Sequence, residues 1–245
     1  MKFVNGQPCW VDIMVKDSAQ QQAITTFLTD LFGIRWEIGG PETGFYGMGF
    51  IGDGQVLAVG QNEHGMGVPS VYLHCDDARA TVEKARSLGA NVFLEPMDVF
   101  DAGTLAMAMD PTGTVFGMWQ GNTMPGFGVM ETPGSFAWFD NRSSASVKAG
   151  EFYAELFGLD FNAMGDGGML VNDGAWLASI STAPAGSPTF WNPIFATADV
   201  VATEALAVSL GCDVLMSGMP VPGGIVSAVH HAASGLTVTF YEIRG

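Results

Sequence analysis

The chain has 245 residues, 48% of them hydrophobic, which is enough for one large core or two ordinary ones. Its 25 acidic and 9 basic residues give a formal net charge of −16. That field repels nucleic-acid phosphates and anionic lipid headgroups, so neither nucleic acid nor a membrane is expected as a partner. Cys9, Cys75 and Cys212 form no CxxC pair, and no apolar run is long enough for a signal peptide or a membrane span. We therefore expect a cytoplasmic protein with reduced thiols.

The first half of the chain alternates short strands with two helices. A strand is predicted from Trp10 to Val15, and helical spacing from Ala19 to Phe32 ends at Gly33, a left-handed cap position. Gly-bounded strands follow at 35–38, 44–50 and 55–60. The same order then recurs as a strand from Val71 to Cys75, a helix from Asp76 to Leu88, and strands near 91–94, 104–109 and 114–119. The pattern is two βαβββ modules.

The second half repeats the first. Residues 27–33 (FLTDLFG) match 152–158 (FYAELFG) at an offset of 125, and 87–89 (SLG) match 209–211 at an offset of 122. Extending the first match backwards without a gap pairs Pro8 with Pro133. A Gly- and Pro-rich stretch separates the halves, so we predict one domain over 1–122, a linker over 123–133 and a second domain over 134–245. The expected fold class is α+β, with two domains, each a pair of βαβββ modules forming a cupped mixed sheet.

These motifs resemble those of the vicinal oxygen chelate superfamily, which includes glyoxalases, bleomycin-resistance proteins and extradiol dioxygenases. The resemblance rests on the two LFG helix ends, on residues 75–80 (CDDARA) followed by Leu88-Gly89-Ala90, and on residues 110–114 (DPTGT) before a strand. Together these motifs span nearly the whole chain. The arrangement is most similar to tandem two-domain glyoxalase-like proteins.

Metal-binding members of that superfamily place His, Gln or Glu ligands on strands that face the cup. The resemblance implies ligand positions at Trp10, Ala58, Ser70 and Gly117, and the repeat offsets map these onto Ser135, Ala178, Asn192 and Thr239. None is His or Glu, whereas a divalent ion needs several oxygen or nitrogen ligands. We therefore expect no metal and no other cofactor. A register shift of one or two residues would restore a metal-dependent lyase or dioxygenase, and that alternative stays open.

Alternation along the strands singles out candidate catalytic residues. Trp10, Asp12 and Met14 share one strand face, and Ser70, Tyr72 and His74 share another, so Asp12 and His74 could look into one cup. We predict Asp12 as a general base, because a carboxylate among Trp and Met loses hydration, with His74 or Tyr72 as its acid or hydrogen-bonding partner. The alternatives are that Asp12 caps backbone amides at a strand end and that His74 is a satisfied, half-buried histidine.

Indoles at cup-facing ligand positions favour an apolar, stacking site for a flat or aromatic small molecule. Met107 and Met109 would add an adaptable wall if they face inward. In the second domain Ala137 aligns with Asp12, and one of the adjacent His230 and His231 must point inward. The predicted substrate-binding residues are Trp10, Met14, Ser70, Met107, Met109, Trp119, Ser135, Asn192 and His230.

The sequence thus predicts a metal-independent protein that binds a small apolar or aromatic metabolite, such as a natural product. As an enzyme it would act by proton transfer, as an isomerase, cyclase or lyase. The main alternative is sequestration of a toxic compound without reaction, as in bleomycin resistance, and a further one is an interaction protein with two vestigial cups. Because tandem duplication supplies internally the pairing that single-domain relatives gain by dimerising, we expect a monomer or a weak homodimer.

Overall fold

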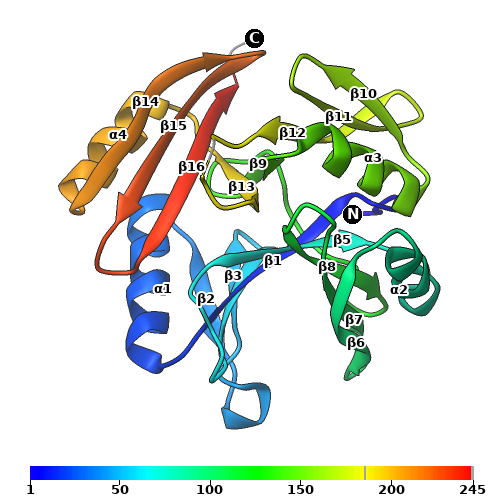
Figure 1. Ribbon diagram of the computed structural model, residues 1–245. Coiled ribbons are helices and arrows are strands. Elements are labelled where there is room, and N and C mark those ends of the chain that lie inside the picture. The colour runs from blue at the N-terminus through cyan, green and yellow to red at the C-terminus, as the bar shows by residue number, and fades with distance from the viewer. Residues whose placement is uncertain (185, 244–245) are drawn as a thin grey trace. The chain divides into compact units, whose positions relative to one another are not determined.

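A computed structural model describes residues 1–184 and 186–243 (Figure 1). The first half contains two modules, each a strand, a helix and three strands. The first module comprises β1 (Pro8–Val15), α1 (Ser18–Phe32), β2 (Arg35–Ile38), β3 (Gly47–Ile51) and β4 (Gly54–Gln61), with a short 3-10 helix, η1, at Pro41–Thr43. The second comprises β5 (Pro69–His74), α2 (Ala78–Ser87), β6 (Asn91–Val99), β7 (Gly103–Met109) and β8 (Val115–Gly121).

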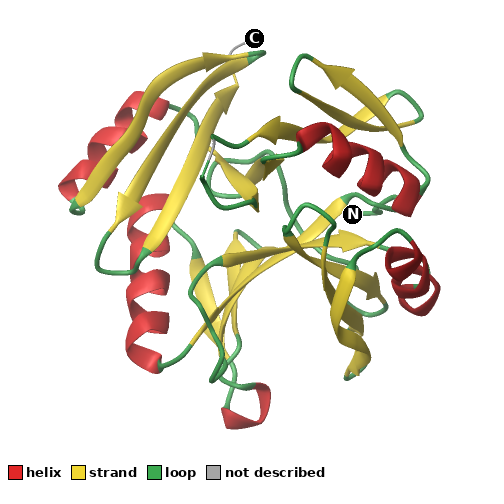
Figure 2. Cartoon of the chain, in the orientation of Figure 1, coloured by secondary structure: helices red, strands yellow, loops and turns green. Residues whose placement is uncertain are grey.

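The second half has the same order of elements (Figure 2). Its first module comprises β9 (Phe136–Ser143), α3 (Ser146–Phe157), β10 (Asp160–Met164), β11 (Gly167–Asn172) and β12 (Ala175–Thr182). Its second comprises β13 (Phe190–Ala196), α4 (Val200–Ser209), β14 (Cys212–Val221), β15 (Gly224–His231) and β16 (Leu236–Ile243). The predicted module order and α+β class are confirmed.

Each half forms one eight-stranded mixed sheet. The strand orders are β2-β3-β4-β1-β5-β8-β7-β6 and β10-β11-β12-β9-β13-β16-β15-β14. Within every module the last three strands pair antiparallel, and the first strand pairs parallel with the fourth, as in β1 with β4 and β5 with β8. In each module the helix covers one face of the strands, as α2 does on β6 and β7 and α4 on β14 and β15 (Figure 1). We call the opposite face of a module its helix-free face.

Local sequence explains where the helices begin and end. The carboxylates of Asp17, Asp77 and Asp199 each accept a hydrogen bond from a backbone N–H in the first turn of α1, α2 and α4. Gly33 has φ 72°, the left-handed cap that the sequence predicted. The strand predicted at 91–94 continues to Val99, and register shifts interrupt its pairing with β7.

Two compact units divide the chain differently from its halves. The first unit contains residues 1–10, 70–126 and 139–192, and the second contains 11–69, 127–138 and 193–245. Each unit therefore combines one module from each half. The predicted boundaries at 122 and 134 follow the repeat, so each predicted domain contributes one module to each unit.

The interior of the first unit is built around aromatic rings and one buried carboxylate. Phe116 lies edge-on to Phe152 and Tyr153, with ring centroids 6.0 and 5.3 Å away. The hydroxyl of Tyr153 donates to Asp110 Oδ2 at 2.9 Å and accepts from Trp191 Nε1 at 3.0 Å. The other Asp110 oxygen, Oδ1, accepts from the backbone and hydroxyl of Thr112 and from the backbone of Thr114. This polar network closes the first unit's core.

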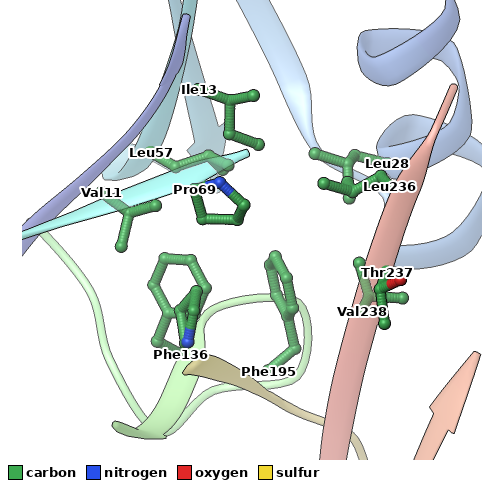
Figure 3. Close-up of a pocket in the computed structure, with 11 residues that line it drawn as sticks. Val11, Ile13, Leu28, Leu57, Pro69, Phe136, Phe195, Leu236, Thr237 and Val238 are labelled. Atoms are coloured by element: carbon green, nitrogen blue, oxygen red, sulfur yellow. The ribbon is translucent and has the colours of Figure 1, made fainter. Parts of the chain in front are cut away.

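The interior of the second unit is apolar at the matching place. Phe32 stacks on Phe195 at 4.3 Å, and Phe195 lies 4.5 Å from Phe136. Figure 3 shows these last two rings facing Leu28 and Leu236 across a small gap. The gap has a volume of about 10 Å³, room for one water at most, so it is a packing defect and not a ligand pocket.

The three cysteines are buried, unbridged thiols. Burial raises the pKa of Cys9 well above its usual value and that of Cys75 to about 12. Both act as small core residues. Among residues 1–184 and 186–243, no helix is both long and apolar enough to cross a membrane.

Candidate functional site

The helix-free face of β5, β7 and β8 brings several predicted site residues together. Tyr72 of β5 lies opposite Gly117 of β8, which in turn lies opposite Met107 of β7. One step along, His74 lies opposite Trp119, and Met109 lies opposite Val115 at the other end. Because paired residues point to the same side, Met107 and Met109 do share a face with Tyr72 and Trp119.

Tyr72 occupies the space over Gly117. A Cβ atom at Gly117 would overlap the Tyr72 ring, so only glycine fits beneath it. Gly117 stands where the superfamily resemblance implied a glutamate ligand. The phenyl ring therefore fills the volume that a carboxylate side chain would need.

Trp119 is held from two sides. Its indole Nε1 donates to the carbonyl oxygen of Met124 at 2.9 Å, and its ring lies over Gly103, where a Cβ atom would come within 2.7 Å of it. Only 6% of the residue is exposed. Trp119 thus builds the wall of this face, and a ligand could reach only its remaining edge.

His74 is half-buried at the end of β5. Its backbone pairs with Gly6 and Gln7, and its Nε2 lies 3.5 Å from Asp76 Oδ1. Its Nδ1 is buried and has no hydrogen-bond partner among the residues that the structure describes. That nitrogen is sealed from solvent, so a ligand could reach it only after neighbouring side chains move. Ser70, also predicted for the site, is half-buried near the start of the same strand.

Asp12 lies in the interior of β1, which runs on to Val15, so it does not cap a strand end. Its partner on β4 is Ala58, and Met14 pairs with Gly60 two residues on. Asp12 is 7% exposed. Val11 and Ile13 line a gap together with Leu28 of α1, so alternation puts this buried carboxylate on the helix-free face of the first module.

The structural repeat corrects the predicted match between the halves. Strand β9 corresponds to β1 at an offset of 128 residues, and the offset falls to 125 after the helix because α3 has 12 residues and α1 has 15. The counterparts of Trp10 and Asp12 are therefore Trp138 and Asp140, and neither Ser135 nor Ala137 corresponds to them. Registers agree, since Asp12 pairs with Ala58 and Asp140 with Ser179 in equivalent parallel pairs.

Ser135 is a turn residue. It lies just before β9, where its hydroxyl donates to the Thr132 carbonyl at 2.8 Å and accepts from the Thr132 N–H at 3.0 Å. The prediction of Ser135 as a cup-facing residue fails because the gapless alignment ignored the shorter helix. The repeated Trp-x-Asp at 10–12 and 138–140 was the signal that could have shown the true register.

Asp140 belongs to a polar cluster on the helix-free face of β9 and β12. Its two carboxylate oxygens accept from Ser179 Oγ at 2.7 Å and from Ser181 Oγ at 2.6 Å. Burial raises its pKa, and the two serine hydroxyls and the nearby Arg142 partly offset this. The second half therefore contains a buried carboxylate that the sequence analysis missed.

The two adjacent histidines of β15 point to opposite faces. His231 stacks on Phe27 of α1 with centroids 4.2 Å apart, so it faces the helix side. His230 therefore faces away from α1, where its Nδ1 lies 3.1 Å from Thr237 Oγ1. Asn192, the remaining predicted residue, is half-buried on β13.

An open groove of about 420 Å³ lies elsewhere in the second unit, along α1 beside His231. Its lining residues include Gln22, Thr26 and Asp30 from the outer face of α1. None of the predicted site residues lines it.

Comparison with known proteins places this arrangement in a family. No protein-family model matches the sequence. The anthracycline biosynthesis protein DnrV of Streptomyces peucetius is 31% identical over 253 residues, covering 91% of this chain and 88% of its own length. CFP32 of Mycobacterium tuberculosis, which is named as a glyoxylase, is 29% identical over 90% of this chain and 88% of its own length. The chain belongs to the vicinal oxygen chelate superfamily.

Solved structures agree on the fold of this superfamily. The Mn(II)-bound glyoxalase of Novosphingobium aromaticivorans matches with a TM-score of 0.71 at 15% identity, over 98% of this chain and 82% of the glyoxalase. The trihydroxybiphenyl dioxygenase of Sphingomonas wittichii matches with a TM-score of 0.67 at 12% identity, over 98% and 92% of the two chains. At such identities the likeness shows the fold and leaves the chemistry to the residues.

The residues of this superfamily member do not fit the metal that many relatives hold. With the corrected register the implied ligand positions are Trp10, Ala58, Ser70 and Gly117 in the first half and Trp138, Ser179, Asn192 and Thr239 in the second. None offers a carboxylate, imidazole or thiolate, and the Tyr72 ring fills the space over Gly117. Within residues 1–184 and 186–243, no three His, Cys, Asp or Glu side chains gather as a metal site would require.

Proposed function

We propose that the chain binds a small, flat aromatic metabolite on the helix-free face of β5, β7 and β8 and acts on it by proton transfer without a metal. The observation that carries the proposal is the Tyr72 ring over Gly117, with Met107 beside it. Aromatic and thioether groups thus stand where the superfamily has charged ligands. Such a surface favours stacking and dispersion contacts with a flat apolar guest.

The proposed chemistry is proton transfer at an acidic carbon whose carbanion is conjugated with a carbonyl. A general base takes the proton, the C–H electron pair moves toward the carbonyl oxygen, and that oxygen gains negative charge. Asp12 is the base that the sequence predicts. His74 donates a hydrogen bond to this oxygen. Return of the proton from Asp12 to another carbon completes an isomerisation or sets up ring closure. No oxidant or reductant is consumed.

The named relatives support a natural-product substrate. DnrV and the similar DauV of a Streptomyces strain are both named as anthracycline biosynthesis proteins. Anthracyclines are fused-ring aromatic compounds, the shape that the Tyr72 face favours. We therefore assign this chain a substrate of the polycyclic aromatic ketone class.

Anthrone tests both parts of the proposal, since it is a flat tricyclic ketone with an acidic methylene beside its aromatic rings. Binding is measured by tryptophan fluorescence, and proton abstraction by loss of the methylene NMR signal in D₂O. Tyr72→Ala should weaken binding about tenfold, roughly the 1.4 kcal/mol expected of one aromatic contact. Asp12→Asn should lower the exchange rate at least about a hundredfold, within the usual contribution of a general base, and leave the Kd within about threefold.

Asp53→Asn is the matched control, because Asp53 is exposed in the turn between β3 and β4 of the same unit as Asp12. It should change neither binding nor exchange. Binding without catalysed exchange would favour sequestration over catalysis. Absence of anthrone binding would refute the proposal as a whole.

A further inference from the structure

We propose that the second half carries a separate binding site for a neutral, polyhydroxylated small molecule on the helix-free face of β9 and β12, formed by Asp140, Ser181 and Arg142. All three residues belong to the first unit. The site shares no residue with the aromatic face, so it stands or falls independently of the proposed function.

A comparison of β1 with β9 shows which residues differ between the two halves. Each half has a buried Asp on its first strand, Asp12 and Asp140, opposite equivalent positions of the fourth strand. Two residues beyond the Asp, Met14 is replaced by Arg142. On the partner strand Ala58 and Gly60 are replaced by Ser179 and Ser181. At all three of these positions the first half has a residue without a polar side chain and the second half has a polar one.

The hydrogen bonds define what a ligand must offer. Ser181 donates its hydroxyl proton to Asp140 at 2.6 Å, so toward a ligand its oxygen can act only as an acceptor. Each carboxylate oxygen of Asp140 likewise accepts more than one hydrogen bond. The cluster is therefore rich in acceptors and needs ligand groups that donate.

Arg142, in contrast, calls for ligand groups that accept hydrogen bonds. Arg142 is half-buried as a residue, and its charge contributes to the electrostatics of Asp140. No carboxylate lies within 4.0 Å of its guanidinium, which makes no hydrogen bond in the described ranges 1–184 and 186–243. Five N–H donors thus need acceptors. Arg142 and Asp140 are two residues apart on one strand face, roughly 6.5 Å along the strand. A molecule with several hydroxyl groups satisfies both, since each hydroxyl donates and accepts.

Charge decides against an anion. An anion would gain from Arg142 but would lie beside Asp140 and inside the field of a chain with net charge −16. A neutral polyol meets neither penalty. The same reasoning makes inorganic phosphate the informative competitor in a test.

The test uses the full chain and myo-inositol as the probe, with side-chain NMR of Arg142 and of the Asp140 carboxyl carbon as the readout. We expect inositol to shift both signals in a saturable way. Asp140→Asn and Arg142→Met, the second restoring the first-half residue, should each weaken binding at least about tenfold, as removal of a charged hydrogen-bonding group does. Asp166→Asn is the control, since Asp166 is an exposed turn residue of the same module.

Each other outcome overturns the proposal. A response to phosphate but not to inositol would make this an anion site centred on Arg142. Inositol binding that survives both variants would lie elsewhere. Absence of a response to either probe would leave the cluster a structural network. Arg142→Met keeps the test valid should Asp140→Asn fail to fold, and thermal melting of each variant identifies that case.

Discussion

The two compact units share a backbone plan but differ in how they fill it. In the first unit the interior carries Asp110, Tyr153 and Trp191, joined by hydrogen bonds. The offsets of the repeat place Ala232, Leu28 and Pro69 at the matching positions of the second unit, where a gap of about 10 Å³ remains among apolar groups. The helix-free faces differ in the same sense, since Asp140 has serine partners and Asp12 has Ala58 and Gly60 opposite and beside it.

This contrast indicates that buried polar residues that bond to one another are gained or lost together. A buried carboxylate is stable only when its oxygens are satisfied, so Asp110 requires Tyr153 and the two threonines together. An apolar interior tolerates residue changes one at a time, at the cost of small voids. The same backbone plan thus accommodates a hydrogen-bonded polar interior in one unit and an apolar interior in the other. Variants in each unit can distinguish the two.

Removing the carboxylate of Asp110 should have the largest effect. Asp110→Ala leaves the Tyr153 hydroxyl and the backbone N–H groups of Thr112 and Thr114 without their buried acceptor. We expect a loss of about 3–5 kcal/mol in the free energy of unfolding, measured by urea denaturation. Ala232→Gly at the matching position of the second unit is the control and should cost about 1 kcal/mol or less. A similarly small cost for Asp110→Ala would show that the network is not a stabilising element.

Removing only the Tyr153 hydroxyl should have a smaller effect. Tyr153→Phe keeps the ring against Phe116 but leaves Asp110 Oδ2 and Trp191 Nε1 without their shared partner. We expect a loss of about 1–3 kcal/mol. The double variant with Asp110→Ala should cost less than the sum of the two single changes, because both remove one interaction. Full additivity would contradict a coupled network.

The fold could be predicted from sequence because its signals are local. Apolar alternation, the left-handed Gly33 and the Asp caps each report on a few neighbouring residues, and the repeat confirmed their order. Register in the second half was wrong for a physical reason. A helix that loses three residues still ends at the same glycine, so the strand before it shifts by three while the helix end stays aligned.

The sequence predicted the site only where side-chain alternation along a single strand determines which residues share a face. Alternation put Tyr72 and His74 on one strand face, and it left the direction of Met107 open until the strand pairing was known. It could not show that Tyr72 covers Gly117 or that Trp119 is tied to Met124, since both depend on side-chain packing between strands. The Asp110–Tyr153–Trp191 network was missed because it joins residues from different halves, which no local pattern reports.

The acidity of Asp140 offers a pH-dependent contrast. Its folded-state pKa is raised above the ordinary value of 3.8, mainly by burial, so the folded state binds this proton more tightly than the unfolded state does. The stabilising contribution is therefore fully present below the unfolded pKa and is lost as pH rises through the folded pKa. Wild type should lose stability relative to Asp140→Asn as the pH rises from the ordinary pKa value of 3.8 through the raised folded-state pKa, measured by urea denaturation at each pH. A constant difference would mean that Asp140 titrates normally.

Filling the gap in the second unit should have the smallest effect. Val11 lines it, and its counterpart in the first unit is the larger, buried Phe139. Val11→Ile adds one methylene toward the space and should stabilise the protein by about 0.5 kcal/mol, seen as a rise in the urea midpoint. Val15→Ile, buried on the same strand but away from the gap, should be neutral or destabilising. Equal effects at both positions would show that β1 relaxes around added volume, and the apolar unit would then owe its tolerance to a yielding backbone rather than to a void.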